Sequence, residues 1–156
     1  MNASIHRLLG VLAIIAVALP TSADANAPAG QYVVTAGGTG NGTVYDTKSK
    51  LTWQQTVSST TYTWADAKTY CAGVGASLGG TAWRLPTLKE LQSLVDYSQS
   101  TAPVIDPNSF PSTPATWFWS ASPVAFSPSI AWVVTFLNGD TYSFVVSYTN
   151  SVRCVR

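Results

Sequence analysis

Two cysteines, Cys71 and Cys154, lie more than half the chain length apart, and a bond between them limits the possible folds more than any other feature of the sequence. Such a bond fixes the middle of the chain beside its C-terminus. An even number of cysteines favours a disulfide if the chain is exported to an oxidising compartment. We therefore predict a Cys71–Cys154 disulfide. The alternative is a pair of reduced thiols available for catalysis or for a metal.

The first 25 residues have the three zones of a secretory signal peptide. Arg7 lies in a short N-terminal segment, residues 8–19 are small and apolar, and Ala23-Asp24-Ala25 has the small-x-small pattern of a cleavage site. The apolar run is too short for a spanning helix, which needs about 20 residues. We predict cleavage between Ala25 and Asn26, no membrane span afterwards, and a secreted, periplasmic or cell-surface protein. An uncleaved anchor is the alternative.

Removing the signal peptide also removes the only histidine, His6, which excludes whole classes of active site. Ser-His-Asp catalysis, Cys-His catalysis and His-ligated zinc sites all need that side chain. The remaining acidic residues are dispersed, and no pair stands out as the two carboxylates of a glycosidase. Basic and acidic residues nearly balance, so nucleic acid is not an expected partner. We predict no catalytic residue, no metal and no cofactor.

Two short polar motifs offer oxygen atoms that suit calcium. Asp106 and Asn108 flank a proline, and Asn138 and Asp140 flank a glycine. Calcium takes six to eight oxygen ligands, usually from several carboxylates, and these motifs supply only part of such a set. Both motifs are also typical of turns, which is the interpretation we favour.

The N-terminal half of the mature chain predicts one strand, one hairpin and one helix. Residues 26–39 form a leader with a first strand at 31–35, and residues 43–53 form a hairpin around a polar turn. Residues 63–74 have helical spacing, with Thr63 as N-cap. Cys71 lies on the buried face of this helix near its end, a position that suits a disulfide to a C-terminal strand.

The stretch WRLPTLKEL, residues 83–91, combines an aromatic side chain, a cation and the start of a second helix. Pro86 is suited to the position just before a helix, and Thr87 with Glu90 forms a T-x-x-E capping box. Arg84 beside Trp83 is expected to hold neighbouring loops through carbonyl groups or stacking. We interpret these residues as a structural hinge, and this role competes with a catalytic role for Glu90.

The C-terminal half predicts a long loop followed by β structure. Four prolines in residues 98–116 favour an extended loop laid over the core. Residues 117–122 have the alternation of a strand, and residues 122–129 are predicted to form a loop. Asn138-Gly139 predicts a type I′ hairpin within residues 131–146. Residues 151–156 then close the chain as a final strand that carries Cys154.

All six tryptophans lie in the mature domain, and they are the remaining candidates for ligand binding. Aromatic faces suit the C–H groups of sugars, whereas the competing interpretation is that most tryptophans simply fill the core. We expect at least four of the six in the core. Trp117 and Trp119, next to the proline-rich loop, are the best candidates for partial exposure and ligand binding.

Six motifs in order carry a resemblance to a known family: TVYDTKSKLTWQQ, TWADAKTYCAGV, WRLPTLKELQSLVDYS, FPSTPATWFWSAS, AWVVTFLNGDTYS and VRCVR. Over residues 40–156 the chain closely resembles the secreted bacterial module of the C-terminal domain of the Legionella collagen-like adhesin, the Lcl C-terminal domain, formerly a domain of unknown function. The resemblance implies an α+β, C-type-lectin-like fold, with two helices packed on short twisted antiparallel sheets, long loops and one disulfide. It also implies kinship with the formylglycine-generating, sulfatase-modifying superfamily, which shares the RLPT element.

The resemblance also guides the expected function. The adhesin module is associated with binding of sulfated glycosaminoglycans and with attachment. Together with the aromatic, histidine-free composition, this favours an exported, non-enzymatic module that binds a glycan or cell-surface ligand. Two alternatives stay open: an enzyme related to the formylglycine-generating oxidases, which use reactive cysteines and copper, and a structural envelope component with a protein partner. The sequence does not predict an oligomeric state.

Overall fold

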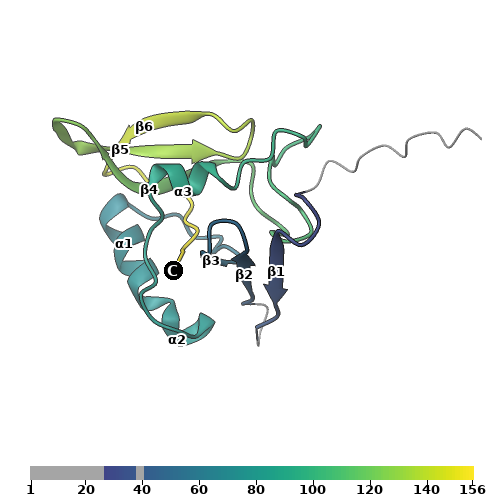
Figure 1. Ribbon diagram of the computed structural model, residues 1–156. Coiled ribbons are helices and arrows are strands. Elements are labelled where there is room, and N and C mark those ends of the chain that lie inside the picture. Colours follow the sequence, from purple (N-terminus) through teal and green to yellow (C-terminus); the bar gives the residue numbers. More distant parts are fainter. Residues whose placement is uncertain (1–26, 38–40) are drawn as a thin grey trace, which may run out of the picture.

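A computed structural model describes residues 27–37 and 41–156 and contains two antiparallel sheets with helices between them along the chain (Figure 1). The signal peptide and its cleavage site between Ala25 and Asn26 lie outside the described residues, so their prediction stays a prediction. Among the described residues, no helix has both the length and the apolar character needed to cross a membrane.

The first sheet contains β1 (Tyr32–Thr35), β2 (Thr43–Asp46) and β3 (Thr52–Gln54), in the order β1-β2-β3. Its strands confirm the predicted first strand and the predicted hairpin. The carboxylate of Asp46 accepts hydrogen bonds from the Lys48 backbone and the Ser49 hydroxyl, which closes the polar turn between β2 and β3. Val44 and Trp53 pair across the two strands and are fully buried.

The second sheet contains β4 (Trp117–Val124), β5 (Ser127–Thr135) and β6 (Thr141–Val145), in the order β4-β5-β6. The predicted loop over residues 122–129 is therefore wrong, because β4 and β5 continue through it as a hairpin. The register shifts on both sides of Pro123, so that proline lies at an irregularity where a missing N–H group is tolerated.

The turn between β5 and β6 also differs from the prediction. A type I′ turn needs a positive φ at both central residues, but only Gly139 has one, at 84°. Phe136 leaves the β5–β6 ladder, because its N–H donates to Thr116 and its carbonyl accepts from Val104. Since Phe136 is held by these loops and fully buried, the connection becomes a longer loop over residues 136–140.

Three helices lie between the sheets in sequence: α1 (Trp64–Gly73), the single turn α2 (Gly75–Leu78) and α3 (Leu88–Gln92). The hydroxyl of Thr63 accepts from the Asp66 N–H, which confirms the predicted N-cap of α1. Helix α3 begins directly after the predicted capping residue Thr87. Residues 98–116 contain no helix or strand, as predicted, and cover the core with Val104, Ile105 and Phe110.

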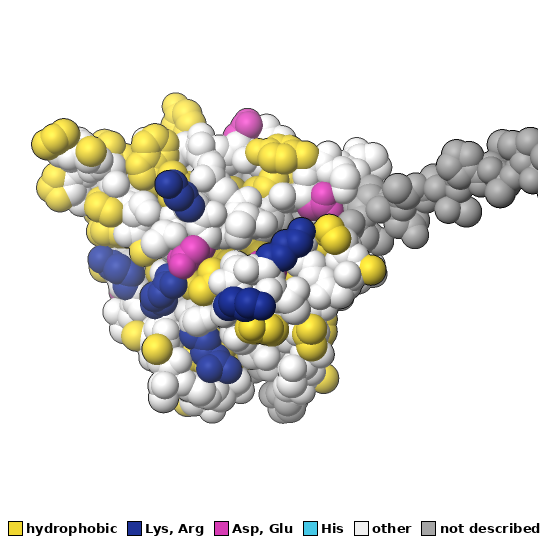
Figure 2. All heavy atoms as spheres, viewed as in Figure 1, with side chains coloured by type: hydrophobic (Ala, Val, Ile, Leu, Met, Phe, Trp, Pro, Cys, Tyr) yellow, Lys and Arg dark blue, Asp and Glu magenta, His cyan; other side chains and the backbone are white. Residues whose placement is uncertain are grey.

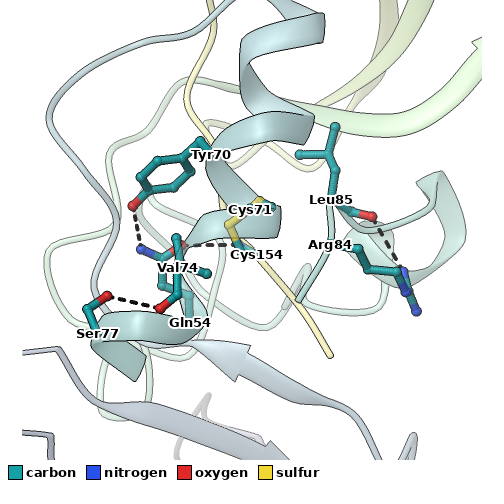
Figure 3. The surroundings of a disulfide bond; sticks show 8 residues. All are labelled: Gln54, Tyr70, Cys71, Val74, Ser77, Arg84, Leu85 and Cys154. Atoms are coloured by element: carbon teal, nitrogen blue, oxygen red, sulfur yellow. Dashed lines mark hydrogen bonds between the residues drawn. A yellow bond between two sulfur atoms is a disulfide. The ribbon is translucent and has the colours of Figure 1, made fainter. Parts of the chain in front are cut away.

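Residues 151–156 do not form the predicted final strand. They make isolated bridges instead: Ser151 pairs with Phe118, and Val155 pairs with both Trp53 and Arg84. The C-terminus therefore runs between α1 and β3, where Figure 1 places it. This position brings Cys154 to α1, and the predicted Cys71–Cys154 disulfide is confirmed, with both cysteines fully buried (Figure 3).

The core consists of two clusters, one on each face of the β4–β5–β6 sheet. Phe118, Val134 and Phe136 join the first cluster with α3 and the first sheet, and Trp119 and Val133 join the second cluster with α1 and the disulfide. The faces differ because alternate residues of a strand point to opposite sides. The predicted α+β class, with two helices of more than one turn, two antiparallel sheets, long loops and one disulfide, is confirmed.

Candidate functional site

The WRLPTLKEL stretch is a structural junction. The Thr87 hydroxyl accepts from the Glu90 N–H, and the Glu90 carboxylate accepts from the Thr87 N–H at 2.7 Å, which completes the predicted capping box. Arg84 donates two hydrogen bonds to the same carboxylate, at 2.7 and 2.8 Å. Pro86 accepts from the backbone of Ala121 in β4. The motif thus joins α3 to the second sheet and, through Arg84 and Val155, to the C-terminus.

Trp83 is buried in this junction, where its indole N–H donates to the Gly79 carbonyl at 2.8 Å. The cation that faces its ring is Arg156, 5.5 Å from the ring centroid, whereas Arg84 turns to Glu90. The expectation that Arg84 holds neighbouring loops through carbonyls or stacking is wrong, because its side chain pairs with the Glu90 carboxylate and its one carbonyl contact, with the adjacent Leu85, is long at 3.4 Å. The polar side chains of Trp83, Arg84, Thr87 and Glu90 are therefore all used in holding the fold.

Glu90 gives a testable pH dependence. The bidentate Arg84 bond and the two bonds to Thr87 lower the pKa of Glu90 from 4.5 to about 2, against the effect of burial. Because the folded pKa is depressed, the stabilisation is present above pH 4.5 and is lost as the pH falls towards 2. We expect Glu90→Gln, which keeps the cap, to lower the free energy of unfolding by about 1 kcal/mol or less at pH 7, since solvent reaches both members of the pair and screens it.

Urea denaturation of the wild type, Glu90→Gln and Glu90→Ala at pH 7 and at pH 3 checks this. The difference between the wild type and Glu90→Gln should shrink at the lower pH. Glu90→Ala should cost about 1 kcal/mol more than Glu90→Gln at both values, because it also removes the cap. A difference that is the same at both pH values would contradict the assigned ion pair.

The two tryptophans expected at the ligand site lie differently in the structure. Trp119 has 0% of its surface exposed, and its indole N–H donates to the Tyr62 carbonyl at 2.8 Å, so it is a core residue and the prediction of its exposure is wrong. Trp117 is half-buried and remains accessible. Three of the six tryptophans are buried (Trp53, Trp83 and Trp119), one fewer than expected, and the other three are half-buried.

Trp117 belongs to a row of four aromatic side chains, which we call the aromatic strip: Trp117, Tyr142, Phe144 and Tyr148. The centroids of Trp117 and Phe144 are 5.4 Å apart in an edge-to-face arrangement. Phe144 also contacts Tyr142 at 5.7 Å and Tyr148 at 6.0 Å. Tyr142 and Tyr148 are 60% and 58% exposed, so the strip presents ring surface to solvent.

The strand register explains why these rings share one face. Val133 of β5 pairs with Trp119 on one side and with Tyr142 on the other, so all three side chains point to the same side of the sheet. Helix α1 and the Tyr62 segment cover Trp119 on this face, whereas Trp117 and Phe144 lie at the margin of the covered cluster. In the part of the chain that the structure describes, β6 pairs with β5 alone, so Tyr142 and Phe144 lie on an edge strand, whereas Trp117 lies on β4.

Basic side chains form a second surface feature. Figure 2 shows Lys and Arg side chains spread over the face that carries α3, with few acidic groups among them. Six of the basic residues among the described residues are exposed: Lys48, Lys50, Lys68, Arg84, Lys89 and Arg156. Three of them have partners: Arg84 pairs with Glu90, the Lys68 ammonium lies 3.6 Å from the centroid of the Trp64 ring, and Arg156 faces the Trp83 ring.

The polar motifs that suit calcium are both engaged in turns. Asp106 accepts from the Asn108 N–H, and Asn138 and Asp140 bond each other in the β5–β6 loop. Within residues 27–37 and 41–156, no three His, Cys, Asp or Glu residues gather as metal ligands. The cysteines are bonded to each other, so the alternative of two reduced thiols is wrong for this structure.

Sequence reasoning missed Tyr142, Phe144 and Tyr148 as site residues. The available signal was the alternation of TYSFV, residues 141–145, which places Tyr142 and Phe144 on one face of a strand. That signal identifies a shared face but not its exposure. The exposure depends on how much of the sheet face α1 packs against, which is a tertiary property.

Comparison with known proteins agrees with the motifs. No curated protein matches the chain. The sequence model of the Lcl C-terminal domain matches residues 42–156, which is most of the chain and includes the disulfide, the WRLPTLKEL stretch and the aromatic strip. The chain therefore belongs to the Lcl C-terminal domain family.

Proposed function

We propose that this protein is an exported, non-enzymatic binding module that holds a glycan on the aromatic strip. The observation that carries the proposal is a row of four touching rings, two of them more than half exposed, along one face of the second sheet. Exposed apolar surface of this kind is characteristic of interaction sites. Flat ring faces pack against the C–H faces of sugars, and the two phenol hydroxyls offer hydrogen bonds at the rim.

The setting of the strip supports a binding role. Trp117 and Phe144 rest against the buried cluster that contains the disulfide, so the strip is attached to a rigid part of the molecule. A rigid aromatic surface loses little conformational freedom on binding, which favours affinity. The buried disulfide is also consistent with an oxidising compartment outside the cytoplasm.

The test is a glycan array with the wild type and with Tyr142→Ala and Trp117→Ala. We expect each substitution to weaken binding of the best glycan at least about tenfold, which corresponds to about 1.4 kcal/mol. Phe126→Ala is the matched control, because Phe126 is fully exposed but lies in the β4–β5 turn outside the strip. That variant should bind like the wild type.

Three outcomes would count against the proposal. An array without any signal would remove the glycan ligand, and equal binding by the wild type and both strip variants would remove the site. Binding restricted to sulfated glycans, abolished by salt and unaffected at Tyr142, would move the site to the basic face of Figure 2.

A further inference from the structure

We propose that a groove along helix α1 is a second glycan site and that it accepts uncharged sugar chains. The groove has a volume of about 500 Å³ beside the start of α1, and a neighbouring hollow of about 360 Å³ shares Thr69 and Tyr70 with it. The inference rests on the proposed function for the class of ligand, but the groove residues are different from those of the strip.

The floor of the groove is a pair of stacked tyrosines. The rings of Tyr62 and Tyr70 lie 4.7 Å apart with an angle of 25° between their planes. Both side chains are half-buried and rest against the cluster around the disulfide. Each ring covers one face of the other, so the surface left for a pyranose ring consists of an outer ring face and ring edges, with the phenol hydroxyls beside them.

The positions of both tyrosines are fixed by contacts behind them. The Tyr70 hydroxyl accepts from the side-chain amide of Gln54 at 3.0 Å, and the carbonyl of that amide accepts from the Cys154 N–H, as Figure 3 shows. The backbone of Tyr62 exchanges two hydrogen bonds with Asn150 at 3.0 Å. The floor is therefore held before a ligand arrives, and binding does not have to order it.

Hydroxyl groups surround this floor. Four threonines line the groove, and in the described structure the hydroxyls of Thr61 and Thr149 have no protein partner. The other two are engaged, because the Thr63 hydroxyl donates to Asp66 at 2.7 Å and the Thr69 hydroxyl donates to the Ala65 carbonyl at 3.2 Å. Free hydroxyls both donate and accept, so they suit the hydroxyls of a sugar.

The groove follows the helix instead of ending at the tyrosines. Asp66, Thr69, Tyr70 and Gly73 recur at spacings of three and four, so they lie along one side of α1, and Ser77 of α2 continues the line. Ten helical residues extend over about 15 Å. This length suits a chain of several sugars rather than a single ring.

The charge of the groove lining determines which kind of glycan chain fits it. Among the residues that the structure describes, Asp66 is the only charged one that lines either part of the groove, and no lysine or arginine lines them. Lys68 of the same helix lies over the Trp64 ring instead. A carboxylate without a neighbouring cation repels sulfate and carboxylate groups, so an uncharged glycan fits the groove and an acidic one does not.

The experiment is titration of the ¹⁵N-labelled protein with uncharged hexasaccharides (cellohexaose, maltohexaose and N-acetylchitohexaose) and with a heparin hexasaccharide, followed by amide NMR. We expect at least one uncharged hexasaccharide to shift the amides of Tyr62, Thr69 and Thr149, and we expect no shift there with heparin. These readouts locate the ligand on the protein directly.

Two variants change the groove in opposite ways, one by filling it and one by removing part of its floor. Gly73→Gln adds a side chain where a Cβ atom meets nothing within 4 Å, so it obstructs the hollow without disturbing the helix. Tyr62→Ala removes half of the stacked floor. We expect the affinity to fall at least about fivefold with Gly73→Gln and about tenfold with Tyr62→Ala. Ala72→Gln, at the adjacent exposed position of α1, is the matched control and should bind like the wild type.

The outcomes separate this inference from the proposed function. Shifts confined to Tyr142, Phe144 and Tyr148, with normal affinity for Gly73→Gln, would overturn the groove and leave the strip intact. Groove shifts that persist in Tyr142→Ala would support the groove even if the strip binds nothing. No shift with any of the three uncharged hexasaccharides, or groove shifts with heparin, would overturn the inference.

Discussion

Replacing both Cys71 and Cys154 by alanine is expected to lower the free energy of unfolding by about 4 to 5 kcal/mol, a large part of the 5 to 15 kcal/mol typical of a domain. The disulfide closes a loop of 83 residues, and the chain-entropy estimate for a loop of that length is about 4.5 kcal/mol. Both cysteines are fully buried, so the alanines also leave unfilled space in the core. Urea denaturation of the oxidised wild type and the double variant measures the difference.

Reduction of the wild type is the matched control, because it opens the same loop without changing the side-chain volume. The reduced wild type should unfold at a lower urea concentration than the oxidised protein but above the double alanine variant. Equal midpoints for the oxidised and reduced proteins would contradict a major role for the bond in stability.

Replacing both cysteines by alanine should also affect the proposed groove along α1. Cys154 donates its backbone N–H to Gln54, and Gln54 donates to the Tyr70 hydroxyl, so the position of the C-terminal segment fixes one ring of the groove floor. Glycan binding at the groove should therefore weaken in the double variant even under conditions where it is folded. Binding at the aromatic strip depends less on this contact, since Tyr142 and Phe144 are held by β5.

The parts of the fold that the sequence predicted correctly depend on neighbouring residues. The N-caps at Thr63 and Thr87 each use a backbone N–H three residues ahead, so the pattern that predicts them is complete within one turn of helix. The disulfide was predictable for a different reason: the chain contains only two cysteines, which leaves a single possible pairing.

The predictions that proved wrong all depend on contacts between residues that are far apart in the sequence. Trp117 and Trp119 have the same alternation and composition around them, and only the placement of Tyr62 and α1 makes one accessible and the other fully buried. Phe136 likewise leaves its strand because Thr116 and Val104 bond its backbone. Neither partner is visible in a local pattern, so the candidate site was predicted in one of its four residues, Trp117.

Arg153 is the second position where a large effect is expected, and local patterns gave no indication of it. Its side chain is fully buried, and its guanidinium lies 4.7 Å from the centroid of the Phe110 ring. The only salt bridge among the described residues is elsewhere, between Arg84 and Glu90, so Arg153 has no carboxylate partner. Burial lowers the pKa of Arg153 to about 9. The cation is held by neutral acceptors alone.

Those acceptors come from separate parts of the chain. Nη1 donates to the carbonyls of Gln54 and Gln55 at 2.7 and 2.6 Å, and Nη2 donates to the Thr113 hydroxyl at 2.7 Å, while Nε has no hydrogen-bond partner among the described residues. Arg153→Ala removes the donor from the carbonyls of Gln54 and Gln55, at about 1 to 3 kcal/mol for each buried group, and leaves a void, whereas the Thr113 hydroxyl keeps its bond to the Phe110 carbonyl. Removing the buried charge offsets part of this cost. We expect a net loss of about 4 kcal/mol in the free energy of unfolding.

Arg153→Met separates the two contributions, because methionine fills most of the volume but makes none of the hydrogen bonds. It should cost about 2 to 3 kcal/mol, less than Arg153→Ala, when both are measured by urea denaturation. Arg84→Met is the control for the loss of a surface arginine and should cost about 1 kcal/mol or less. If Arg153→Met were as stable as the wild type, the hydrogen bonds would do no more than compensate for burying the charge.

A second measurement distinguishes a general loss of stability from the specific contact. Arg153 holds Thr113 and packs on Phe110, both in the long loop of residues 98–116, so its removal should release this loop before the rest of the domain unfolds. Limited proteolysis of Arg153→Met under folding conditions should cut within 98–116 faster than in the wild type. In the double cysteine variant the increase in cutting should instead be spread over the chain, because that substitution acts mainly on the unfolded state.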